Sequence, residues 1–397
     1  MSEAAHPIVR LLPGHDKRVG FGHPWVFSNE IAMDAAAKAL PPGILVSLES
    51  ANGKHLGVAS FNPHTLIAAR LFHRDAQAHI GEDFFIARLE RALLLRRRLY
   101  ETPYYRLIHA EADGLPGLIL DRFGDVLSCQ INTAGMARFE DELLAAMKRV
   151  LAPAAIVLRD DTAARALEGL SGEERVAFGA LEPPVEIVEN GAKFLIDPIG
   201  GQKTGWFYDQ RENRRFVSRF AAGARVLDLY CFAGGFGITA ALAGADQVLG
   251  IDSSEAALGW ATASAKLNGV AERCRFARGE VFAELERLHG QGERFDLVIA
   301  DPPAFARSKK DLGPALRGYR KLARLAAALV AKNGVLFIAS CSHQVEPDAF
   351  AQEIRRGIHD AGREGRVILS SGAAPDHPVH PFLPESAYLK AETLVLD

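Results

Sequence analysis

The chain has 397 residues, of which 48% are hydrophobic and 24% charged, a composition typical of globular proteins with two or three domains at this length. Lys and Arg total 46 against 49 Asp and Glu, and the formal net charge of -3 disfavours a protein that coats nucleic acid non-specifically. The four cysteines form no CxxC pair, and the N-terminal segment lacks the apolar core of a signal peptide. We therefore expect a soluble cytoplasmic protein without a membrane span.

The first 75 residues predict a small β domain. Apolar and polar residues alternate over 45–61 on both sides of Asn52-Gly53, a pair that tolerates the positive φ angles of a hairpin turn. We assign this domain to residues 1–75.

A second domain with mixed α and β structure is expected over residues 76–190. From Gly81 the pattern is helical, with Phe85 and Leu89 on the apolar face and the arginines of 88–98 on a solvated face. The remaining elements are expected in the order strands within 106–131, a helix over 139–150 and a strand over 154–159.

The third domain, residues 191–397, has the pattern of an α/β fold. Short β-rich runs are mostly separated by segments of helical length, as in a parallel sheet whose two faces are covered by helices. These runs cover residues 225–230, 247–252, 274–279, 295–301, 334–340 and 366–371. The last run, 388–396, follows a proline-broken loop with no helix behind it, which leaves an antiparallel entry into the sheet open.

The turn after the first of these runs has the features of a ligand loop. A hydrophobic strand from Val226 leads into glycines and a helix start by Gly237, so the backbone can approach a ligand, although the spacing is not the GxGxxG of dinucleotide sites. Asp228 in this turn suits a cationic group better than a pyrophosphate. Asp252, about 20 residues beyond the loop, can accept hydrogen bonds from ribose hydroxyls, or cap the next helix together with Glu255.

Two further acids follow later strands. Glu280 comes after the third strand, where an adenine amino group could be met, although an isolated acid there is more often a surface carboxylate. Asp301 ends the fourth strand, and Pro302 and Pro303 stiffen the loop behind it. Because open α/β sheets place ligands at strand carboxyl ends, this rigid loop favours function over a plain turn.

Cys341 follows the fifth strand, at the same edge of the sheet as Asp301. A buried cysteine is normally inert, and this is expected for Cys129 and Cys274, but at this edge a thiolate can act as a nucleophile. His343 is weak evidence for a lowered thiol pKa. Cys341 and His343 alone are too few ligands for a metal, so no metal is expected.

The order LDLYCFAGGFG, GIDSS, DPPAF and SCS resembles class I S-adenosylmethionine-dependent methyltransferases. The whole chain is similar to the bacterial rRNA large subunit methyltransferase I family, enzymes that form 5-methylcytosine in 23S rRNA. The supporting phrases are GHPWVFSNE, EADGLPGLILDRFGD, GQKTGWFYDQRENR, DHPV and YLK.

The resemblance implies a PUA-like RNA-binding domain, an α+β linking domain and a Rossmann-like methyltransferase domain with a mixed, mostly parallel seven-stranded sheet. It implies S-adenosyl-L-methionine as the cofactor. The expected partner is a single-stranded or loosened region of 23S rRNA, with a homodimer as a further expectation.

The resemblance also assigns roles within the site. Cys341 is the implied nucleophile, and Asp301 is implied to lie between cofactor and target base. The implied cofactor-binding residues are Asp228, Phe232 and Gly234 around the methionine part, Asp252 at the ribose and Glu280 near the adenine, with Tyr230, Gly235, Ser253 and Asp301 beside them. The implied substrate-binding residues are Pro302, Pro303, Phe305, Arg307 and Lys309. Glu280 replaces the Asp expected in this family, and Tyr230 and Phe232 replace the glycines usual in methyltransferases.

The chemistry explains these residue types. Cytosine C5 is a poor nucleophile until a thiolate adds to C6, after which C5 can attack a sulfonium methyl group. Asp301 could hydrogen-bond the polar edge of the base. No second cysteine stands in the Asp301 loop, so release must use another base or water.

From Arg307 to Lys332 eight basic residues and one acid follow this loop, and they either gather RNA phosphates or form a solvated helix face. The Arg-rich helix at 88–98 is assigned a solvated face, and His23, Trp25 and Phe27 are core candidates.

Three other functions remain open at this point. A guanine-nitrogen methyltransferase would share the fold but need no thiol, and Cys341 argues against it. A non-catalytic RNA-binding assembly factor leaves the four residues Asp228, Asp252, Asp301 and Cys341 unexplained. A nicotinamide-dependent dehydrogenase is disfavoured by the glycine spacing.

Overall fold

The chain folds into two compact units in the computed structural model, which describes residues 6–160, 162–201 and 204–397. The first unit consists of the residues up to Pro183, with Pro198–Trp206 and Asp376–Ser386, and the second of Pro184–Asp197, Phe207–Pro375 and Ala387–Asp397. Within the described ranges, no helix is long and apolar enough to cross a membrane.

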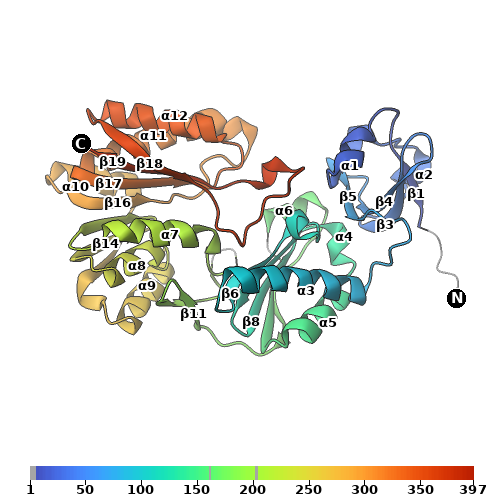
Figure 1. Cartoon of the computed structure of the whole chain (residues 1–397), viewed down its shortest axis with the longest axis horizontal. Helices are drawn as coiled ribbons and strands as arrows, with labels where there is room; N and C mark the ends of the chain where they lie inside the picture. Colours follow the sequence, from blue (N-terminus) through green and yellow to red (C-terminus); the bar gives the residue numbers. More distant parts are fainter. Residues whose placement is uncertain (1–5, 161, 202–203) are drawn as a thin grey trace. The chain divides into compact units, whose positions relative to one another are not determined.

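The first unit begins with a five-stranded sheet in the order β1-β3-β4-β5-β2 (Figure 1). Its strands are β1 (Ile8–Arg10), β2 (Trp25–Phe27), β3 (Ile44–Glu49), β4 (His55–Phe61) and β5 (Ile67–His73), and its short helices are α1 (Lys17–Phe21) and α2 (Ala35–Lys38). The expected hairpin is confirmed, because β3 and β4 pair antiparallel across a turn in which Gly53 has φ 77°. Val46, Leu48 and Phe61 are completely buried in its core.

Residues in and just before β2 test the predicted core of this domain. His23 is buried, whereas Trp25 and Phe27 are only half-buried. The Trp25 indole Nε1 donates to Glu111 Oε1 at 2.7 Å, and Arg18 lies over the Phe27 ring at 4.5 Å. The predicted core position is therefore confirmed for His23. Trp25 and Phe27 lie at the boundary of the core, where Trp25 makes a hydrogen bond and Phe27 a cation–π contact.

A second five-stranded sheet in the first unit has the order β10-β9-β8-β7-β6. Its strands are β6 (Tyr104–His109), β7 (Leu118–Phe123), β8 (Val126–Ile131), β9 (Ala155–Arg159) and β10 (Glu174–Gly179), and its helices are α3 (Glu82–Leu99), α4 (Ala134–Ala137), α5 (Glu140–Leu151) and α6 (Ala163–Leu167). Helices α3 and α5 pack together, and Phe85 and Leu89 of α3 are fully buried. The predicted helices and strands of this region are confirmed.

Arg96 corrects the expectation that the arginines of 88–98 share a solvated face. Its side chain is 0% exposed and donates from Nη1 and Nη2 to the two carboxylate oxygens of Asp113, at 2.7 and 2.8 Å. It also donates to the backbone carbonyls of Arg106 and Asp376 at 3.0 and 2.9 Å. The helical periodicity puts Arg96 beside the apolar stripe of α3. Arg96 can be buried there because its charge is paired with Asp113, 17 residues away in the chain.

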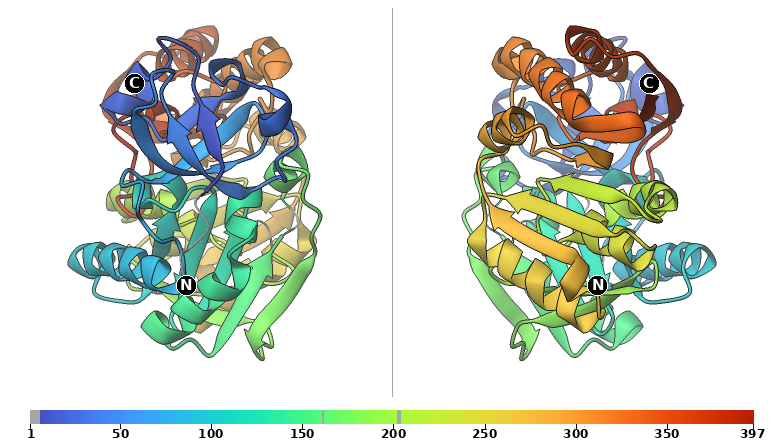
Figure 2. Two further views of the ribbon diagram at one scale, coloured as in Figure 1. Left: turned by 90° about the vertical axis from the view of Figure 1, so that its right-hand side faces the viewer. Right: turned by 90° about the vertical axis from the view of Figure 1, so that its left-hand side faces the viewer.

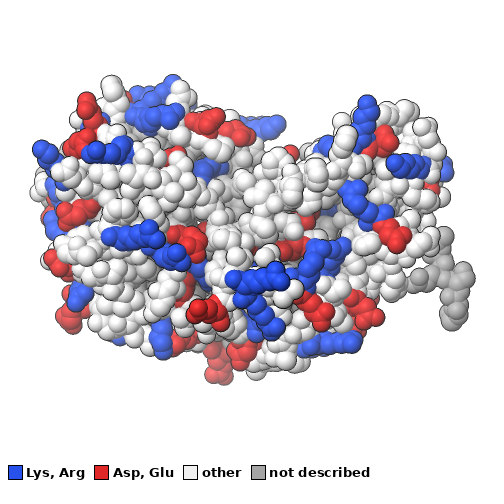
Figure 3. Space-filling view, in the orientation of Figure 1, with Lys and Arg blue, Asp and Glu red and all other residues white. Residues whose placement is uncertain are grey.

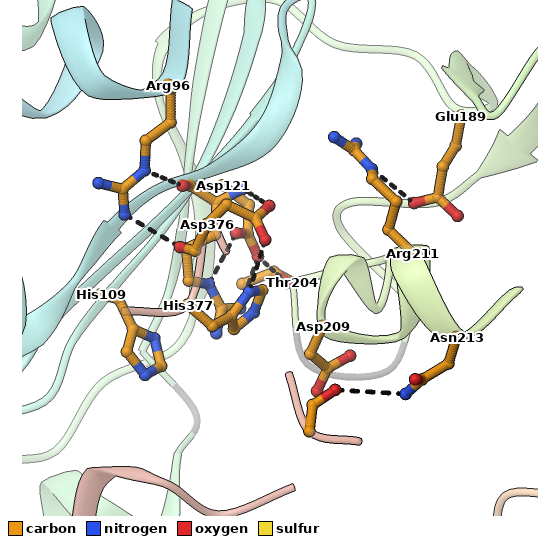
Figure 4. Close-up of polar contacts among 12 residues, drawn as sticks. Arg96, His109, Asp121, Glu189, Thr204, Asp209, Arg211, Asn213, Asp376 and His377 are labelled. Carbon is orange, nitrogen blue, oxygen red and sulfur yellow. Dashed lines mark hydrogen bonds and ion pairs between the residues drawn. The ribbon is translucent and has the colours of Figure 1, made fainter. Parts of the chain in front are cut away.

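The segments Pro198–Trp206 and Asp376–Ser386 join this polar core of the first unit, part of which is drawn in Figure 4. Thr204 donates through Oγ1 to Asp121 Oδ2 at 2.5 Å, and Arg106 binds both oxygens of the same carboxylate at 2.8 Å. Asp376 accepts from the backbone N–H of Arg106 at 2.9 Å. Buried charges are thus paired, as their desolvation requires.

The second unit is built on a seven-stranded sheet in the order β15-β14-β13-β16-β17-β19-β18. Its strands are β13 (Arg225–Leu229), β14 (Gln247–Asp252), β15 (Cys274–Arg278), β16 (Phe295–Ala300), β17 (Val330–Ser340), β18 (Gly365–Ser371) and β19 (Lys390–Leu396). Neighbours from β15 to β17 pair parallel, and β19 lies antiparallel between β17 and β18. The predicted mixed, mostly parallel sheet is confirmed, and the antiparallel entry that the sequence left open is observed.

Helices cover both faces of this sheet (Figures 1 and 2). They are α7 (Arg211–Val217), α8 (Gly235–Leu242) and α9 (Glu255–Leu267) on one face, and α10 (Val281–Gly290), α11 (Leu312–Leu329) and α12 (Pro347–Asp360) on the other. A hairpin of β11 (Val185–Glu189) and β12 (Ala192–Ile196) packs on α9. Because the central strands are buried on both faces, their sequences are continuous apolar runs rather than alternating ones.

Candidate active site

The carboxyl ends of four adjacent parallel strands, β14, β13, β16 and β17, meet at one edge of the sheet. The backbone ties their loops together: Asp301 N donates to Leu229 O at 3.4 Å, and Cys231 N donates to Ile251 O at 3.1 Å. Residues as far apart in the sequence as Leu229 and Asp301 therefore lie beside one another. This edge carries most of the residues that the sequence singled out.

The loop after β13 holds an unusual backbone conformation. Tyr230 and Phe232 have φ angles of 61° and 49°, and Gly234 has 80°. A side chain at Gly234 would place its Cβ 2.9 Å from Ile238 and 3.1 Å from Ala261, so only glycine fits there. Positive φ at two bulky residues costs free energy, and such strain concentrates where the backbone must present itself to a ligand.

Asp252 holds this loop in place. Its Oδ2 accepts the backbone N–H of Phe232 at 2.9 Å, and its Oδ1 accepts that of Ser254 at 2.8 Å. Each carboxylate oxygen has a second lone pair, so the half-buried Asp252 retains acceptor capacity for hydroxyl groups. Ser254, rather than Asp252, caps α9 through its side chain.

Asp228 lies underneath the loop. It is 1% exposed, and its Oδ2 accepts the backbone N–H of Gly237 at 2.8 Å in the first turn of α8. Burial raises the pKa of Asp228 to about 7, since desolvation outweighs the hydrogen bond from Gly237, and the neighbouring charge of Asp301 adds to the rise. Contact of Asp228 with a cofactor stays a prediction.

This burial predicts a pH dependence of stability. The folded state binds the Asp228 proton more tightly than the unfolded chain does, so this stabilisation is present below pH 3.8 and is lost as the pH rises to about 7. We expect Asp228→Asn, whose amide oxygen can still accept from Gly237, to reduce the loss of cofactor-free stability between pH 5 and 8 by about 2.5 kcal/mol, the value of the two pKa units that lie between pH 5 and the raised pKa of about 7. Urea unfolding of both proteins at each pH measures this. Equal slopes in wild type and variant would contradict the assignment.

Glu280 and Ser253 are at the periphery of this edge. Both are exposed, and Glu280 caps α10 by accepting the backbone N–H of Ala283 at 2.9 Å. Burial raises the pKa of the nearby Tyr230 hydroxyl, and the charge of Glu280 raises it further. A contact of Glu280 with adenine stays a prediction.

The loop after β16 brings Asp301 and Cys341 into one neighbourhood. The Cys341 Sγ lies 3.9 Å from the carbonyl oxygen of Pro302, within the range of a weak S–H hydrogen bond. Asp301 and Cys341 are both half-buried, so neither is sealed in the core. Gln210, in the turn before α7, donates to Asp301 Oδ1 at 2.8 Å. The two residues expected to be catalytic therefore lie on adjacent loops.

Serine residues on both sides of Cys341 anchor its backbone. The buried Tyr319 hydroxyl bonds Ser340 Oγ at 2.8 Å and Ser342 Oγ at 2.9 Å. Ser342 Oγ also accepts the backbone N–H of Ala306, at 3.2 Å, from the loop that follows Asp301. This network joins the cysteine segment to the Asp301 loop without involving the thiol.

Lys390 in β19 supports the same segment. Its Nζ donates to the carbonyls of Ser342 and Val345, each at 2.6 Å. Burial lowers the pKa of Lys390, and the neighbouring Cys341 partly opposes that shift. Sequence reasoning did not assign Lys390 or the serines a role. The only sequence signal was their position within the SCS and YLK phrases.

The remaining residues expected at the substrate side lie around these loops. Pro302 is buried and Pro303 exposed, and the Phe305 ring packs on Tyr319 with centroids 4.7 Å apart. The exposed His343 stacks on Tyr388, with centroids 5.2 Å apart. A role of His343 in lowering the Cys341 pKa stays a prediction.

The basic run after the Asp301 loop divides into two groups. Arg320 is bound to Asp360 at 2.6 Å and Lys321 to Glu286 at 3.2 Å, as on an ordinary helix surface. The other basic residues before the end of α11 are exposed: Arg307, Lys309, Lys310, Arg317 and Arg324. On the face shown in Figure 3, basic and acidic side chains are interspersed. Among the described residues, no group of three His, Cys, Asp or Glu side chains could hold a metal ion.

Comparison with known proteins places this site in a family. Residues 154–364 match the model of an S-adenosylmethionine-dependent methyltransferase family, and residues 9–74 match a PUA-like domain. A ribosomal RNA large subunit methyltransferase I from Vibrio cholerae is 38% identical over 391 residues, covering 97% of this chain and 98% of the relative. The enzyme of the same name from Erwinia tasmaniensis is 38% identical over 386 residues, or 96% and 97% of the two chains.

The chain belongs to the ribosomal RNA large subunit methyltransferase I family. Among solved structures, SMU.776 complexed with SAH has a TM-score of 0.83 at 21% identity, covering 98% of this chain and 99% of that one. A SAM-dependent methyltransferase from Agrobacterium tumefaciens has a TM-score of 0.51 at 18% identity, covering 70% and 87%. These two likenesses concern the fold.

The cofactor of this family is S-adenosylmethionine, which carries a methyl group on a positively charged sulfur. The residues present fit it. Asp252 has acceptor capacity for ribose hydroxyls, and the strained Tyr230–Gly235 loop leads directly into the start of α8. The Asp228 carboxylate lies buried beneath, where a cation nearby would favour its ionised form.

Proposed function

We propose that this methyltransferase acts on large-subunit ribosomal RNA, methylating carbon 5 of a cytidine in 23S rRNA with Cys341 as the nucleophile. The names of the relatives support ribosomal RNA as the substrate. The observation that carries the choice of atom is the placement of Cys341 beside Pro302, in the loop that begins with Asp301. Methylation of a nitrogen would need no thiol there.

The chemistry uses groups of this chain in sequence. The Cys341 thiolate forms a bond to C6, and the electron pair of the C5–C6 double bond moves into the ring, which makes C5 nucleophilic. C5 would then bond the methyl group that S-adenosylmethionine supplies, and the S–CH3 bond would break with its electron pair left on the sulfur of S-adenosylhomocysteine. Removal of the C5 proton by a base or water returns the electron pair to the C5–C6 bond, and the thiolate leaves. Asp301 orients the polar edge of the base during these steps.

The substrate base must leave its stack to reach such a site, which favours a single-stranded or loosened RNA segment. The five exposed basic residues that follow the Asp301 loop are proposed to bind phosphates there, with Arg307 and Lys309 nearest to it in sequence. The PUA-like domain is proposed to add a second RNA contact. The cytoplasmic location and the homodimer stay predictions.

A covalent trap tests this proposal. RNA containing 5-fluorocytidine cannot lose a proton from C5, so a cysteine nucleophile stays attached to the base after methyl transfer. With S-adenosylmethionine and fluorinated 23S rRNA, we expect a nuclease-resistant adduct on the peptide that contains Cys341, identified by mass spectrometry. Cofactor-free reactions are the control. Methylation of unfluorinated RNA without any adduct would instead support a guanine-nitrogen methyltransferase, and failure to bind the cofactor would favour a non-catalytic assembly factor.

A further inference from the structure

The neighbouring residues Gln210 and Asn213 form, with the distant Ser371, a line of hydrogen bonds that ends on Asp301. Ser371 Oγ bonds Asn213 Oδ1 at 2.7 Å, Asn213 Nδ2 bonds Gln210 Oε1 at 2.6 Å, and Gln210 Nε2 bonds Asp301 Oδ1 at 2.8 Å. Asn213 and Gln210 are 3% and 2% exposed. Asn213, at the first turns of α7, is labelled in Figure 4.

The direction of this line is fixed at its far end. Asn213 Nδ2 also lies 3.3 Å from the carbonyl oxygen of Gly372, which can only accept a hydrogen bond. The Asn213 nitrogen must therefore face Gly372 and Gln210, so the Gln210 oxygen faces Asn213 and the Gln210 nitrogen faces Asp301. Reversing either amide would set two oxygens or two NH₂ groups against each other, which buried amides avoid.

We infer that Gln210 and Asn213 are positioning residues that hold Asp301 as an ionised hydrogen-bond acceptor, so that the site selects a base with an exocyclic amino group. An N–H donor directed at Oδ1 stabilises the carboxylate over the carboxylic acid. A carboxylate held in this way attracts the amino group of cytosine and repels the carbonyl oxygen that uracil has in the same place. This inference rests on the proposed function for the identity of the base.

The substitution Gln210→Glu tests the direction of the line. It keeps the oxygen that Asn213 binds and replaces the N–H toward Asp301 with a second carboxylate oxygen. Two carboxylates at this distance cannot both ionise freely, and at low pH they share a proton that restores a bridge. We expect kcat at pH 8 to fall about 100-fold, and the ratio of variant to wild-type kcat to recover at least about tenfold at pH 6.

The assay measures tritium transfer from S-adenosylmethionine to 23S rRNA that is taken from cells lacking the gene, and it gives kcat and the KM for both the cofactor and the RNA. Calorimetry measures the affinity for the cofactor separately. Cofactor affinity should stay within about twofold of wild type, because the proposed effect acts on the contact between Asp301 and the base. Ser371→Ala should lose only a few-fold in kcat, because Gly372 still fixes the direction. Glu212 lies in the first turn of α7, between Gln210 and Asn213 in the sequence, but takes no part in this line of hydrogen bonds. Glu212→Gln is therefore the matched control and should behave as wild type.

Three results would overturn the inference. The first is a pH profile of kcat for Gln210→Glu that runs parallel to that of wild type. The others are a loss of cofactor affinity as large as the loss in kcat, or a loss in kcat for Glu212→Gln as large as that for Gln210→Glu. Thermal unfolding of each variant separates these from simple instability. The identity of the wild-type product is judged independently by nucleoside mass spectrometry. If wild type makes a methylated base other than 5-methylcytidine, the proposed function fails, while the pH profile still decides whether Gln210 holds Asp301.

Discussion

Replacing Cys341 with alanine is expected to abolish methyl transfer, with kcat reduced about 10⁴-fold or more, as when an enzyme loses its nucleophile. The thiol lies at the end of β17 beside Pro302, and the hydrogen bonds from Tyr319 that anchor this segment go to Ser340 and Ser342 rather than to the sulfur. The variant should therefore fold and bind S-adenosylmethionine and RNA with wild-type affinity. Tritium transfer to unmodified 23S rRNA measures the first effect, and calorimetry and filter binding measure the second.

Cys274→Ala is the matched control for that experiment. Cys274 begins β15, is half-buried, and burial raises its pKa to about 11, so it is not a reactive thiolate at neutral pH. This variant should turn over as wild type does. Normal turnover by Cys341→Ala would refute covalent catalysis by this residue and would leave direct attack by a nitrogen of the base as the better explanation.

Replacing Arg96 with methionine is expected to lower the free energy of unfolding by about 3–5 kcal/mol. Methionine fills much of the volume but leaves the Asp113 carboxylate, 6% exposed, without the two N–H donors that Arg96 supplies. It also removes the donors to the carbonyls of Arg106 and Asp376. Urea unfolding, followed by circular dichroism, measures the loss.

Arg97→Met provides the comparison for this effect. Arg97 is the next residue of the same helix and is exposed, so its loss should change stability by less than about 0.5 kcal/mol. If both substitutions cost the same, the ion pair of Arg96 is not what distinguishes the two positions. If adding Asp113→Asn to the Arg96→Met variant restores part of the free energy of unfolding, the unpaired Asp113 carboxylate is the cause of the lost stability.

The fold was predictable where local patterns decide it. Continuous apolar runs marked the central strands, and the change to period-3.6 patterns marked the helices, because burial on two faces or on one face leaves those signatures. Arg96 was not predictable in this way. Its helix position sits beside the apolar stripe, and only the fold brings Asp113 and Asp376 to it.

The residues of the candidate site also fall into those that local patterns predict and those that only the fold brings together. Asp252, Asp301 and Cys341 could be proposed because each follows the end of a parallel strand, and such ends share one edge. Gln210 and Asn213 stood in a phrase that supported the resemblance, but no pattern in the sequence indicates their hydrogen-bond partners. Ser371 lies 158 residues from Asn213 in the chain, so that contact appears only when the sheet and α7 are in place.

The position of β19 has a consequence for synthesis of the protein. This strand follows β18 in the chain but inserts between β17 and β18, and its Lys390 holds the carbonyls after Cys341. While the chain is emerging from the ribosome, β17 therefore remains an unpaired edge until residues 390–396 have been translated. A nascent chain can complete its ligand loop after β13 early, but the segment that carries the thiol lacks the two hydrogen bonds from Lys390 until that late strand is made.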